Sequence, residues 1–328
     1  MSSFAGAGSE AVLSSTARIS RRGQWMNVPA LHRGDETVVV DGGIMKIASL
    51  YDEDWIEHEL QSPHAWVDAI RANRSTLNAD ILRFSQKVPD AAPRFKFPME
   101  LRSIAVAEVG NFKKWWESLP QESRKNVRRS AKRGVTIEVK RFDDEVIAGI
   151  ASIQNETPIR QGRRYPHFGK SLDEVSRDHG SFLDRCDFIC AYCEGEIIGF
   201  LKLVYRGNVA ALLQLNSKVA HYDKRPANAL LAKAVELCEA RGATHMTYGL
   251  FNYGSKGHSP LREFKERNGF YEMLLPNYYV PLTAWGQVCV RLKLYRGIRE
   301  FLPQKMVTSA LNLRTKWYSS RTSKAGVA

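Results

Sequence analysis

Residues 224–270 constrain the fold of this chain more than any other segment. They read KRPANALLAKAVELCEARGATHMTYG and, further on, SPLREFKERNGF. Apolar residues recur at the three- and four-residue spacing of an amphipathic helix, and Gly242 follows where a helix end favours a left-handed residue. THMTYG then predicts a short strand, and SPLREFKERNGF predicts a basic helix. The apolar face of the long helix consists of Ala227, Leu230, Leu231, Ala234, Val235 and Cys238.

Two more strands are predicted just before the long helix. EIIGFLKLVY and NVAALLQLNSKV are mainly apolar, and a tight turn at residues 206–208 joins them. The second part of the chain therefore has the order strand, strand, helix, strand, helix, strand. This order resembles the GNAT acyltransferase fold, which implies an α/β (α+β) architecture with a mixed sheet.

Within that superfamily, three segments resemble the Fem-type branch, the peptidoglycan-bridge aminoacyltransferases and their relatives. The first is the Arg- and Lys-rich stretch of residues 119–139, and the second is the long helix with its ARG end. The third is residues 261–270, which are similar to the family's FK…GF signature. Fem-type proteins pair two GNAT-like halves, the first degenerate, so the resemblance implies the same layout here.

Four parts are expected along the chain. Residues 1–34 are rich in Ser, Ala and Gly, which predicts disorder. The resemblance implies a degenerate GNAT-like half at residues 35–118 and an acyltransferase half at residues 119–282. Residues 283–328 predict a basic helical tail, which either lies on anionic lipid or packs on the body with its charges outward.

The charge balance favours a polyanionic partner. Lys and Arg number 48 against 35 Asp and Glu, a net charge of +13. RNA, a phosphate-bearing carrier or substrate, and an anionic membrane surface all fit such a balance. The cations cluster at residues 124–133 and again at residues 291–324, although such runs can also be simple solvated faces.

The length and position of the apolar segments predict the cellular location. No apolar run approaches the ~20 residues of a membrane span. The N-terminal stretch has no apolar core of a secretory signal. We therefore expect a cytoplasmic protein, with the basic tail as a candidate peripheral contact to the inner membrane face.

The five cysteines do not form a recognisable framework. Cys190 and Cys193 make a lone C-x-x-C in a predicted strand, where they would face opposite sides. A zinc site would need a second pair, so buried small apolar residues are the better interpretation and no metal is expected.

One departure from coenzyme A-dependent GNAT enzymes bears on the acyl donor. Those enzymes hold a pyrophosphate on backbone N–H groups of a glycine-rich loop at the start of the long helix. Here Pro226 has no N–H, and Asn228 places a side chain where glycine is expected. No tightly bound cofactor is expected, and the donor co-substrate is an aminoacyl-tRNA, an acyl carrier or acyl-CoA.

Acyl transfer needs a polarised carbonyl and an amine that loses a proton. Lys265 matches the lysine of the FK signature, which implies a role near the acyl group or the donor phosphates; the alternative is a surface lysine. His167 is a candidate general base, since histidine titrates near neutrality, or else a hydrogen-bonding residue. Tyr248 completes the catalytic candidates. The resemblance places the donor at Leu215, Asn216, Ser217, Lys224, Arg225 and Asn228.

The acceptor site is predicted in a loop and at a strand end. Residues 159–170 interleave Arg with aromatic rings, a combination suited to phosphate or carboxylate recognition and to stacking. The end of a central strand is a common ligand position in α/β folds. The alternative is a solvated surface loop. The candidates are Arg160, Gln161, Arg163, Arg164, Tyr165, Lys170, Asn252, Tyr253 and Lys256.

Three functions remain open at this point. The first is a Fem-like acyltransferase that moves an activated acyl or aminoacyl group directly onto an acceptor amine of a small molecule or cell-envelope precursor. The second is an acetyl-CoA-dependent N-acetyltransferase. The third is a non-catalytic, basic RNA- or membrane-binding module on the same fold.

Overall fold

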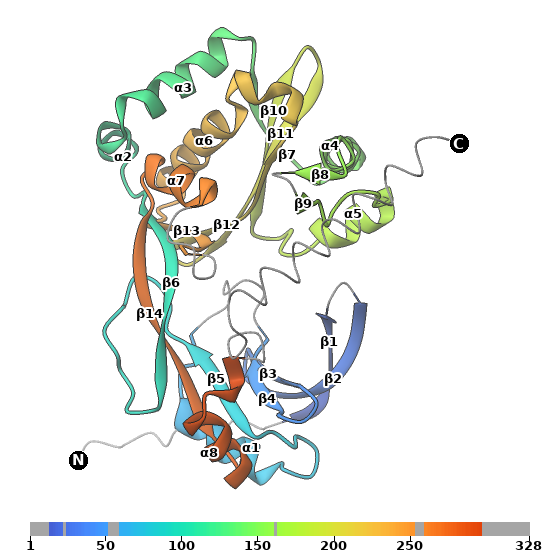
Figure 1. Cartoon of the computed structure of the whole chain (residues 1–328), viewed down its shortest axis with the longest axis vertical. Helices are drawn as coiled ribbons and strands as arrows, with labels where there is room; N and C mark the ends of the chain where they lie inside the picture. Colours follow the sequence, from blue (N-terminus) through green and yellow to red (C-terminus); the bar gives the residue numbers. More distant parts are fainter. Residues whose placement is uncertain (1–12, 22–23, 52–58, 161–162, 253–258, 297–328) are drawn as a thin grey trace, which may run out of the picture.

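The computed structural model describes residues 13–21, 24–51, 59–160, 163–252 and 259–296. Across these residues, twelve strands form one mixed sheet, which confirms the predicted α/β class (Figure 1). From one edge to the other the strands are β1 (Leu13–Arg21), β2 (Gln24–Arg33), β3 (Glu36–Asp41), β4 (Ile47–Leu50), β5 (Ile81–Ser85), β14 (Tyr271–Pro281), β6 (Met99–Glu108), β13 (His245–Leu250), β12 (Val209–Ser217), β11 (Glu196–Arg206), β10 (Cys186–Cys193) and β7 (Thr136–Lys140).

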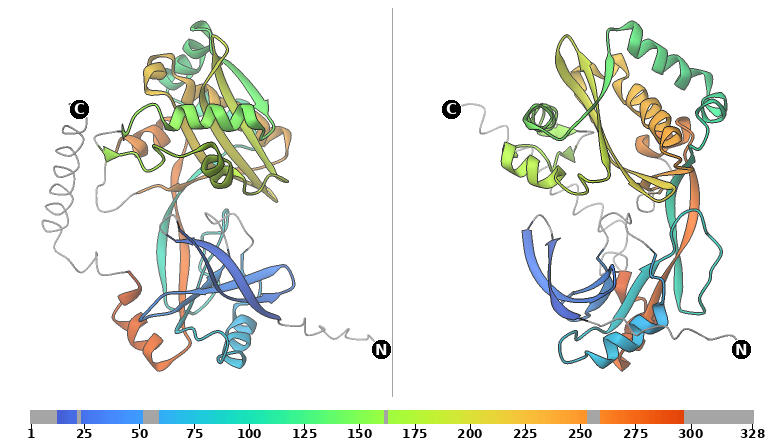
Figure 2. Two further views of the ribbon diagram at one scale, coloured as in Figure 1. Left: turned by 90° about the vertical axis from the view of Figure 1, so that its right-hand side faces the viewer. Right: turned by 180° about the vertical axis from the view of Figure 1, so that it is seen from behind.

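Helices cover both faces of the C-terminal part of this sheet, as Figure 2 shows. One face carries α2 (Phe112–Ser118), α3 (Gln121–Lys132), α6 (Pro226–Ala240) and α7 (Pro260–Arg267). The other face carries α4 (Asp144–Gln154), α5 (Leu172–His179) and the small hairpin of β8 (Ile159–Arg160) and β9 (Arg163–Arg164). In the N-terminal part, α1 (Pro63–Ala72) and α8 (Ala284–Arg291) pack on opposite faces.

Strands β6 and β14 form the antiparallel centre of the sheet and belong to both halves. The end of β14 pairs with β5, from Asn277 opposite Ser85 to Pro281 opposite Ile81. The end of β6 pairs with β13, where His245 lies opposite Glu108. A strand late in the chain therefore completes the first half, and a strand from early in the chain completes the second.

The two halves repeat one arrangement around this central pair. In the first half, parallel strands β4 and β5 are connected through α1. In the second half, parallel strands β12 and β13 are connected through α6. Each unit is preceded by antiparallel strands, which is the strand, strand, helix, strand order that the resemblance implies. The predicted pair of GNAT-like halves is thus present, although the halves exchange strands across the predicted boundary at residues 118 and 119.

The long helix α6 forms as its apolar spacing predicts. Leu230, Leu231 and Val235 are fully buried against the sheet and fill the main core of the C-terminal half. Burial of each such side chain contributes about 2 kcal/mol relative to an exposed one. Gly242 follows the helix with a φ of +71°, the left-handed conformation expected after a helix end. This core fixes α6 across strands of the C-terminal half of the sheet.

Cysteines occupy the two faces of β10 as predicted. Cys190 is fully buried in the core under α4, and Cys193 is buried in the core under α6. Both are free thiols. In the part of the chain that the structure describes, no group of His, Cys, Asp and Glu side chains is arranged to hold a metal ion, and no helix is long and apolar enough to cross a membrane.

The predicted disorder of residues 1–34 is wrong for β1 and β2. These strands pair with each other, and β2 also pairs with β3, where Ala30 lies opposite Val39. Ala30 and Leu31 are fully buried. The segment is rich in small residues, but small residues pack well on a covered sheet face. Composition also does not show which strand a segment can pair with, and here β3 is the partner of β2. Residues 1–12 lie outside the described residues.

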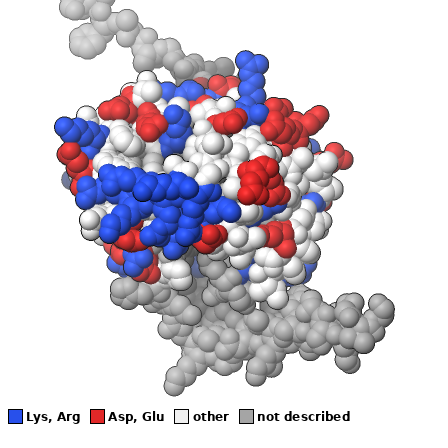
Figure 3. All heavy atoms as spheres, turned by 90° about the horizontal axis from the view of Figure 1, so that it is seen from above, with Lys and Arg blue, Asp and Glu red and all other residues white. Residues whose placement is uncertain are grey.

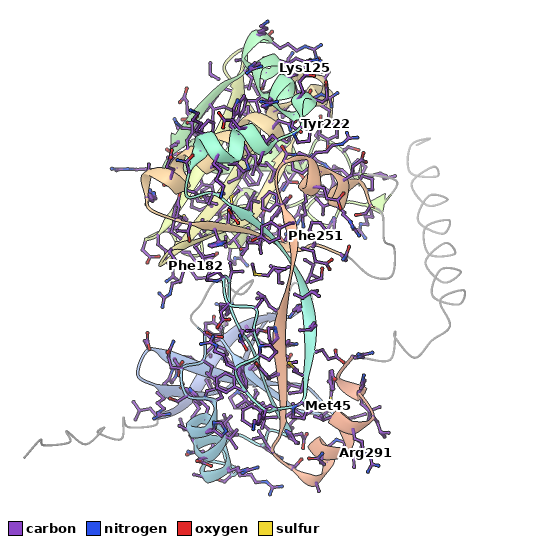
Figure 4. All side chains as sticks on the ribbon, turned by 90° about the vertical axis from the view of Figure 1, so that its left-hand side faces the viewer. Met45, Lys125, Phe182, Tyr222, Phe251 and Arg291 are labelled. Atoms are coloured by element: carbon purple, nitrogen blue, oxygen red, sulfur yellow. The ribbon has the colours of Figure 1, made fainter. Side chains whose placement is uncertain are left out.

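The start of the C-terminal tail packs on the body. Cys289 and Val290 of α8 are buried against Ile81 and Tyr279. The Tyr295 ring in η2 (Leu294–Arg296) stacks on Tyr279 with 3.8 Å between centroids. Figure 4 shows Arg291 at the opposite end of the molecule from Lys125. The packed alternative therefore holds for residues 284–296, and the rest of the predicted tail lies outside the described residues.

Candidate active site between two diverging strands

Strands β12 and β13 run side by side only briefly. Their parallel pairing begins at Val209 opposite His245 and ends at Ala211 opposite Thr247. Beyond Ala211, β12 pairs only with β11 among the described strands. Beyond Ala211, the backbone edge of β12 that faces β13 therefore has no strand partner among the described residues.

A bulge interrupts β12 where the two strands part. The pairing register with β11 shifts between Lys202 and Leu203, so Leu213 is the extra residue. Bulges redirect backbone groups and are frequent beside active sites. The donor position was predicted at residues 215–217; the bulge lies slightly earlier, and the unpaired edge continues through those residues.

Lys265 lies next to this opening and is fully buried. Its Nζ donates to the carbonyl oxygens of Tyr248 at 2.6 Å and Leu250 at 2.7 Å, beyond the part of β13 that pairs with β12. The Tyr248 ring covers the ammonium at 4.4 Å. Burial lowers the pKa of Lys265 to about 8. The surface-lysine alternative is wrong, because the helix α7 directs this cation into the protein.

The loop that would hold a pyrophosphate in a coenzyme A-dependent enzyme is engaged by an internal carboxylate. The loop forms η1 (Val219–Lys224) between β12 and α6. Glu156 accepts hydrogen bonds from the backbone N–H of Val219 at 2.6 Å and of Ala220 at 2.9 Å. The first two backbone donors of this loop are therefore satisfied by the protein itself.

The start of α6 also departs from a phosphate cradle. Arg225 at the N-cap has a φ of +58°, and Pro226 follows without an N–H. The buried Asn228 side chain donates to Asn268 at 3.0 Å, so it fastens α6 to the end of α7. Of the predicted donor residues here, Arg225 is exposed and Lys224 is half-buried.

An internal carboxylate occupies the matching place in the N-terminal half. Glu36 is buried beside the start of α1. It accepts from the N–H of Gln61 at 2.8 Å and from the indole N–H of Trp66 at 2.5 Å. Both halves therefore place a carboxylate on the segment that precedes the crossover helix, Glu36 directly before α1 and Glu156 at the start of η1, which leads into α6.

The predicted acceptor loop meets the end of β12 from the opposite face of the sheet. Arg160 donates to the carbonyl of Ser217 at 3.2 Å, and its guanidinium lies 4.5 Å from the ring centre of Tyr165. The Tyr165 hydroxyl donates to Asn216 Oδ1 at 3.4 Å. Predicted donor and acceptor residues are thus brought together, although Arg160, which also binds Glu156, mainly holds the loop.

His167 is hydrogen-bonded to Lys170, whose Nζ lies 3.2 Å from the imidazole Nδ1. Lys170 also pairs with Asp178. Burial, and then the Lys170 charge, lower the pKa of His167, so the ring is neutral at pH 7. An ammonium only donates, so Nδ1 accepts and the ring proton sits on Nε2. In this tautomer Nε2 can only donate a hydrogen bond, so the arrangement does not support the predicted role of His167 as general base.

Two other predicted acceptor residues, Asn252 and Arg164, lie on different segments of the chain. Asn252 is fixed by Arg262 at 2.9 Å and Glu272 at 2.8 Å. Arg164 is exposed on β9, which also contains Arg163. Gln161, Tyr253 and Lys256 lie outside the described residues.

Sequence reasoning missed a buried polar cluster beneath α4 and α5. His179 Nε2 lies 3.1 Å from the side-chain nitrogen of Gln154, and Lys202 Nζ donates to the carbonyl oxygens of His179 at 2.8 Å and Ser181 at 2.6 Å. All but Ser181 are nearly or fully buried. A lone lysine within the apolar run EIIGFLKLVY was the available signal.

We expect His179→Gln to make the protein less sensitive to acid. Burial, and then the Lys202 charge, lower the pKa of His179 to about 4, whereas the unfolded chain binds this proton near 6.5. The unfolded state then holds more protons between these values, so the free energy of unfolding falls by about 3 kcal/mol as pH drops from 7 to 4. Urea denaturation at both pH values should show a smaller loss for the variant; an equal loss would contradict this role.

No protein-family model and no curated protein sequence matches the chain. Solved structures do. The chain shares the fold of FemX. The TM-score is 0.59 at 11% identity, over 85% of this chain and 90% of FemX. L-PGS from Bacillus licheniformis has a TM-score of 0.51 at 14% identity, over 79% of this chain and 86% of that one.

A third similar structure is the C-terminal domain of a putative lysylphosphatidylglycerol synthetase from Agrobacterium fabrum. Its TM-score is 0.51 at 14% identity, over 79% of this chain and 84% of that domain. At these identities the likeness is one of fold. It extends across both halves and confirms the GNAT-like architecture predicted from the sequence.

Proposed function

We propose that this protein is a Fem-like acyltransferase that transfers an aminoacyl group from aminoacyl-tRNA to an amine of a cell-envelope precursor. The observation that carries the proposal is the opening between β12 and β13, with buried Lys265 beside it and Glu156 on the loop where coenzyme A phosphates would bind. The opening and the buried Lys265 suit acyl transfer. The Glu156 carboxylate disfavours a coenzyme A donor.

The proposed reaction proceeds by direct attack. The acceptor nitrogen adds to the ester carbonyl of the donor, the carbon–oxygen bond to the ribose breaks, and the proton that the nitrogen gives up ends on the ribose oxygen. Backbone N–H groups on the free edge of β12 polarise the carbonyl, and the Lys265 charge stabilises the oxyanion from nearby. His167 donates to the acceptor on the other face of the sheet.

The acceptor and cellular location follow from the same reasoning. A neighbour of the same fold is named for lysylphosphatidylglycerol, so an anionic lipid, which would attack through a hydroxyl oxygen in place of the amine nitrogen, is a second acceptor to test beside a nucleotide-linked cell-wall precursor. Both acceptors are accessible to a cytoplasmic protein at the inner membrane face. The net charge of +13 favours such anionic partners and a tRNA donor.

Ligand-dependent stabilisation tests the donor. A ligand at a hundred times its dissociation constant stabilises the folded protein by about 2.7 kcal/mol. We expect bulk aminoacyl-tRNA to raise the melting temperature, whereas coenzyme A and acetyl-CoA leave it unchanged. Label transfer from mixed labelled aminoacyl-tRNAs to each acceptor then tests the reaction. Stabilisation by coenzyme A species alone, or acetyl transfer from acetyl-CoA, would replace this proposal with an ordinary N-acetyltransferase.

A further inference from the structure

Helix α3 carries an uncompensated band of positive charge. Lys125, Arg128 and Lys132 are exposed, and Arg124 is half-buried. Among the described residues none of these four pairs with a carboxylate, whereas Arg129 approaches Glu122 and Arg133 binds Asp223. Figure 3 looks down on the end of the molecule where α3 lies and shows the blue side chains gathered in one band. A concentration of unpaired cations favours a polyanion.

We propose that the exposed face of α3 is a docking surface for the phosphate backbone of RNA. This inference rests on the proposed tRNA donor and locates its binding. Lys125, Arg128 and Lys132 span about 10 Å along the helix at 1.5 Å per residue. This length lets the three side chains contact successive phosphates of one strand. The Arg128 guanidinium also lies 5.5 Å from the Trp116 ring, which holds it in place.

The position of α3 connects this surface to the candidate site. Helices α3, α6 and α7 share one face of the sheet, and the Ser123 hydroxyl donates to the Arg267 carbonyl at 2.6 Å. Arg267 ends the helix that carries Lys265. An RNA stem on α3 therefore lies beside the helices that border the opening, on the face opposite the acceptor loop.

RNA fits this surface better than a lipid bilayer does. Peripheral membrane helices insert large apolar side chains between the headgroups. None of the large apolar side chains that are exposed in the described part of the chain lies on α3. Of its four cations that pair with no described carboxylate, two are arginines, which contact phosphate oxygens bidentately. The surface therefore offers phosphate contacts without an anchor for lipid.

Matched charge reversals test this surface. The first variant combines Lys125→Glu, Arg128→Glu and Lys132→Glu. The control combines Arg71→Glu, Arg74→Glu and Lys96→Glu, which are exposed in the N-terminal half and change the net charge equally. Fluorescence anisotropy with uncharged bulk tRNA should show at least a tenfold loss of affinity for the first variant, a salt slope lower by about 2 to 3, and less than a threefold loss for the control. Circular dichroism verifies that both variants are folded.

Several outcomes would overturn the inference. The first is an equal loss of tRNA affinity in both variants. The second is the absence of tRNA binding by the wild type at low salt. The third is a first variant that still binds tRNA but no longer binds phosphatidylglycerol vesicles. Transfer activity separates this inference from the proposed function. If the wild type transfers no aminoacyl group yet binds tRNA through α3, the surface stands and the donor assignment fails. If transfer proceeds unchanged in the first variant, the surface is wrong and the function stands.

Discussion

Lys265→Met is expected to lower the aminoacyl transfer rate by about a hundredfold. The methionine side chain fills the same buried space but removes the cation beside the opening between β12 and β13. Loss of one preorganised group that stabilises an oxyanion costs a factor of about 10² to 10³. Single-turnover transfer from labelled aminoacyl-tRNA measures the chemical step separately from donor binding.

The charge itself can be separated from structural support. Lys265 also satisfies the carbonyl oxygens of Tyr248 and Leu250, so the methionine variant loses about 2 kcal/mol of unfolding free energy as well. Lys265→Arg keeps a positive charge at all working pH values. It should therefore retain more activity than the methionine variant.

The pH dependence distinguishes these roles further. With a pKa of about 8, Lys265 loses its charge as pH rises through this value, so the wild-type rate should fall above pH 8. The arginine variant should show no such fall. A methionine variant as active as the wild type would mean that Lys265 only supports β13.

Signals within a short stretch of sequence account for local structure. The capping box at Ser171 and Glu174 starts α5, and Asp143 caps α4 by accepting from the Val146 N–H. Such signals act within one turn of helix, so the residues that make them lie together in the sequence. The apolar face of α6 is read in the same way.

Long-range features were beyond local patterns. Nothing in YEMLLPNYYVPLT indicates that β14 pairs with β5 of the first half, where Tyr278 is fully buried in the core. A period of two predicts a strand but not its partner. Glu156 was missed for a related reason, since its partners Val219 and Ala220 are far away in the sequence and are backbone groups that every residue has.

Glu156→Ala is expected to give the protein a measurable affinity for inorganic pyrophosphate. In the wild type, the carboxylate satisfies the N–H groups of Val219 and Ala220. The substitution frees both donors and removes one negative charge beside a loop that precedes a helix, an arrangement that attracts anions. We expect at least a tenfold gain in affinity by isothermal titration, and a loss of about 3 kcal/mol in unfolding free energy because two charge-assisted bonds are broken.

Glu196→Ala is the matched control, because it removes the same charge from the Lys218 ion pair nearby and leaves the loop donors engaged. A gain confined to the Glu156 variant means that the carboxylate takes the place of a phosphate, so that a diphosphate-bearing donor is excluded by an internal competitor. An equal gain in both variants would mean that local charge alone decides anion binding. The absence of any gain would mean that Pro226 and Asn228 suffice to close the cradle, with Glu156 only bracing the loop against Arg160.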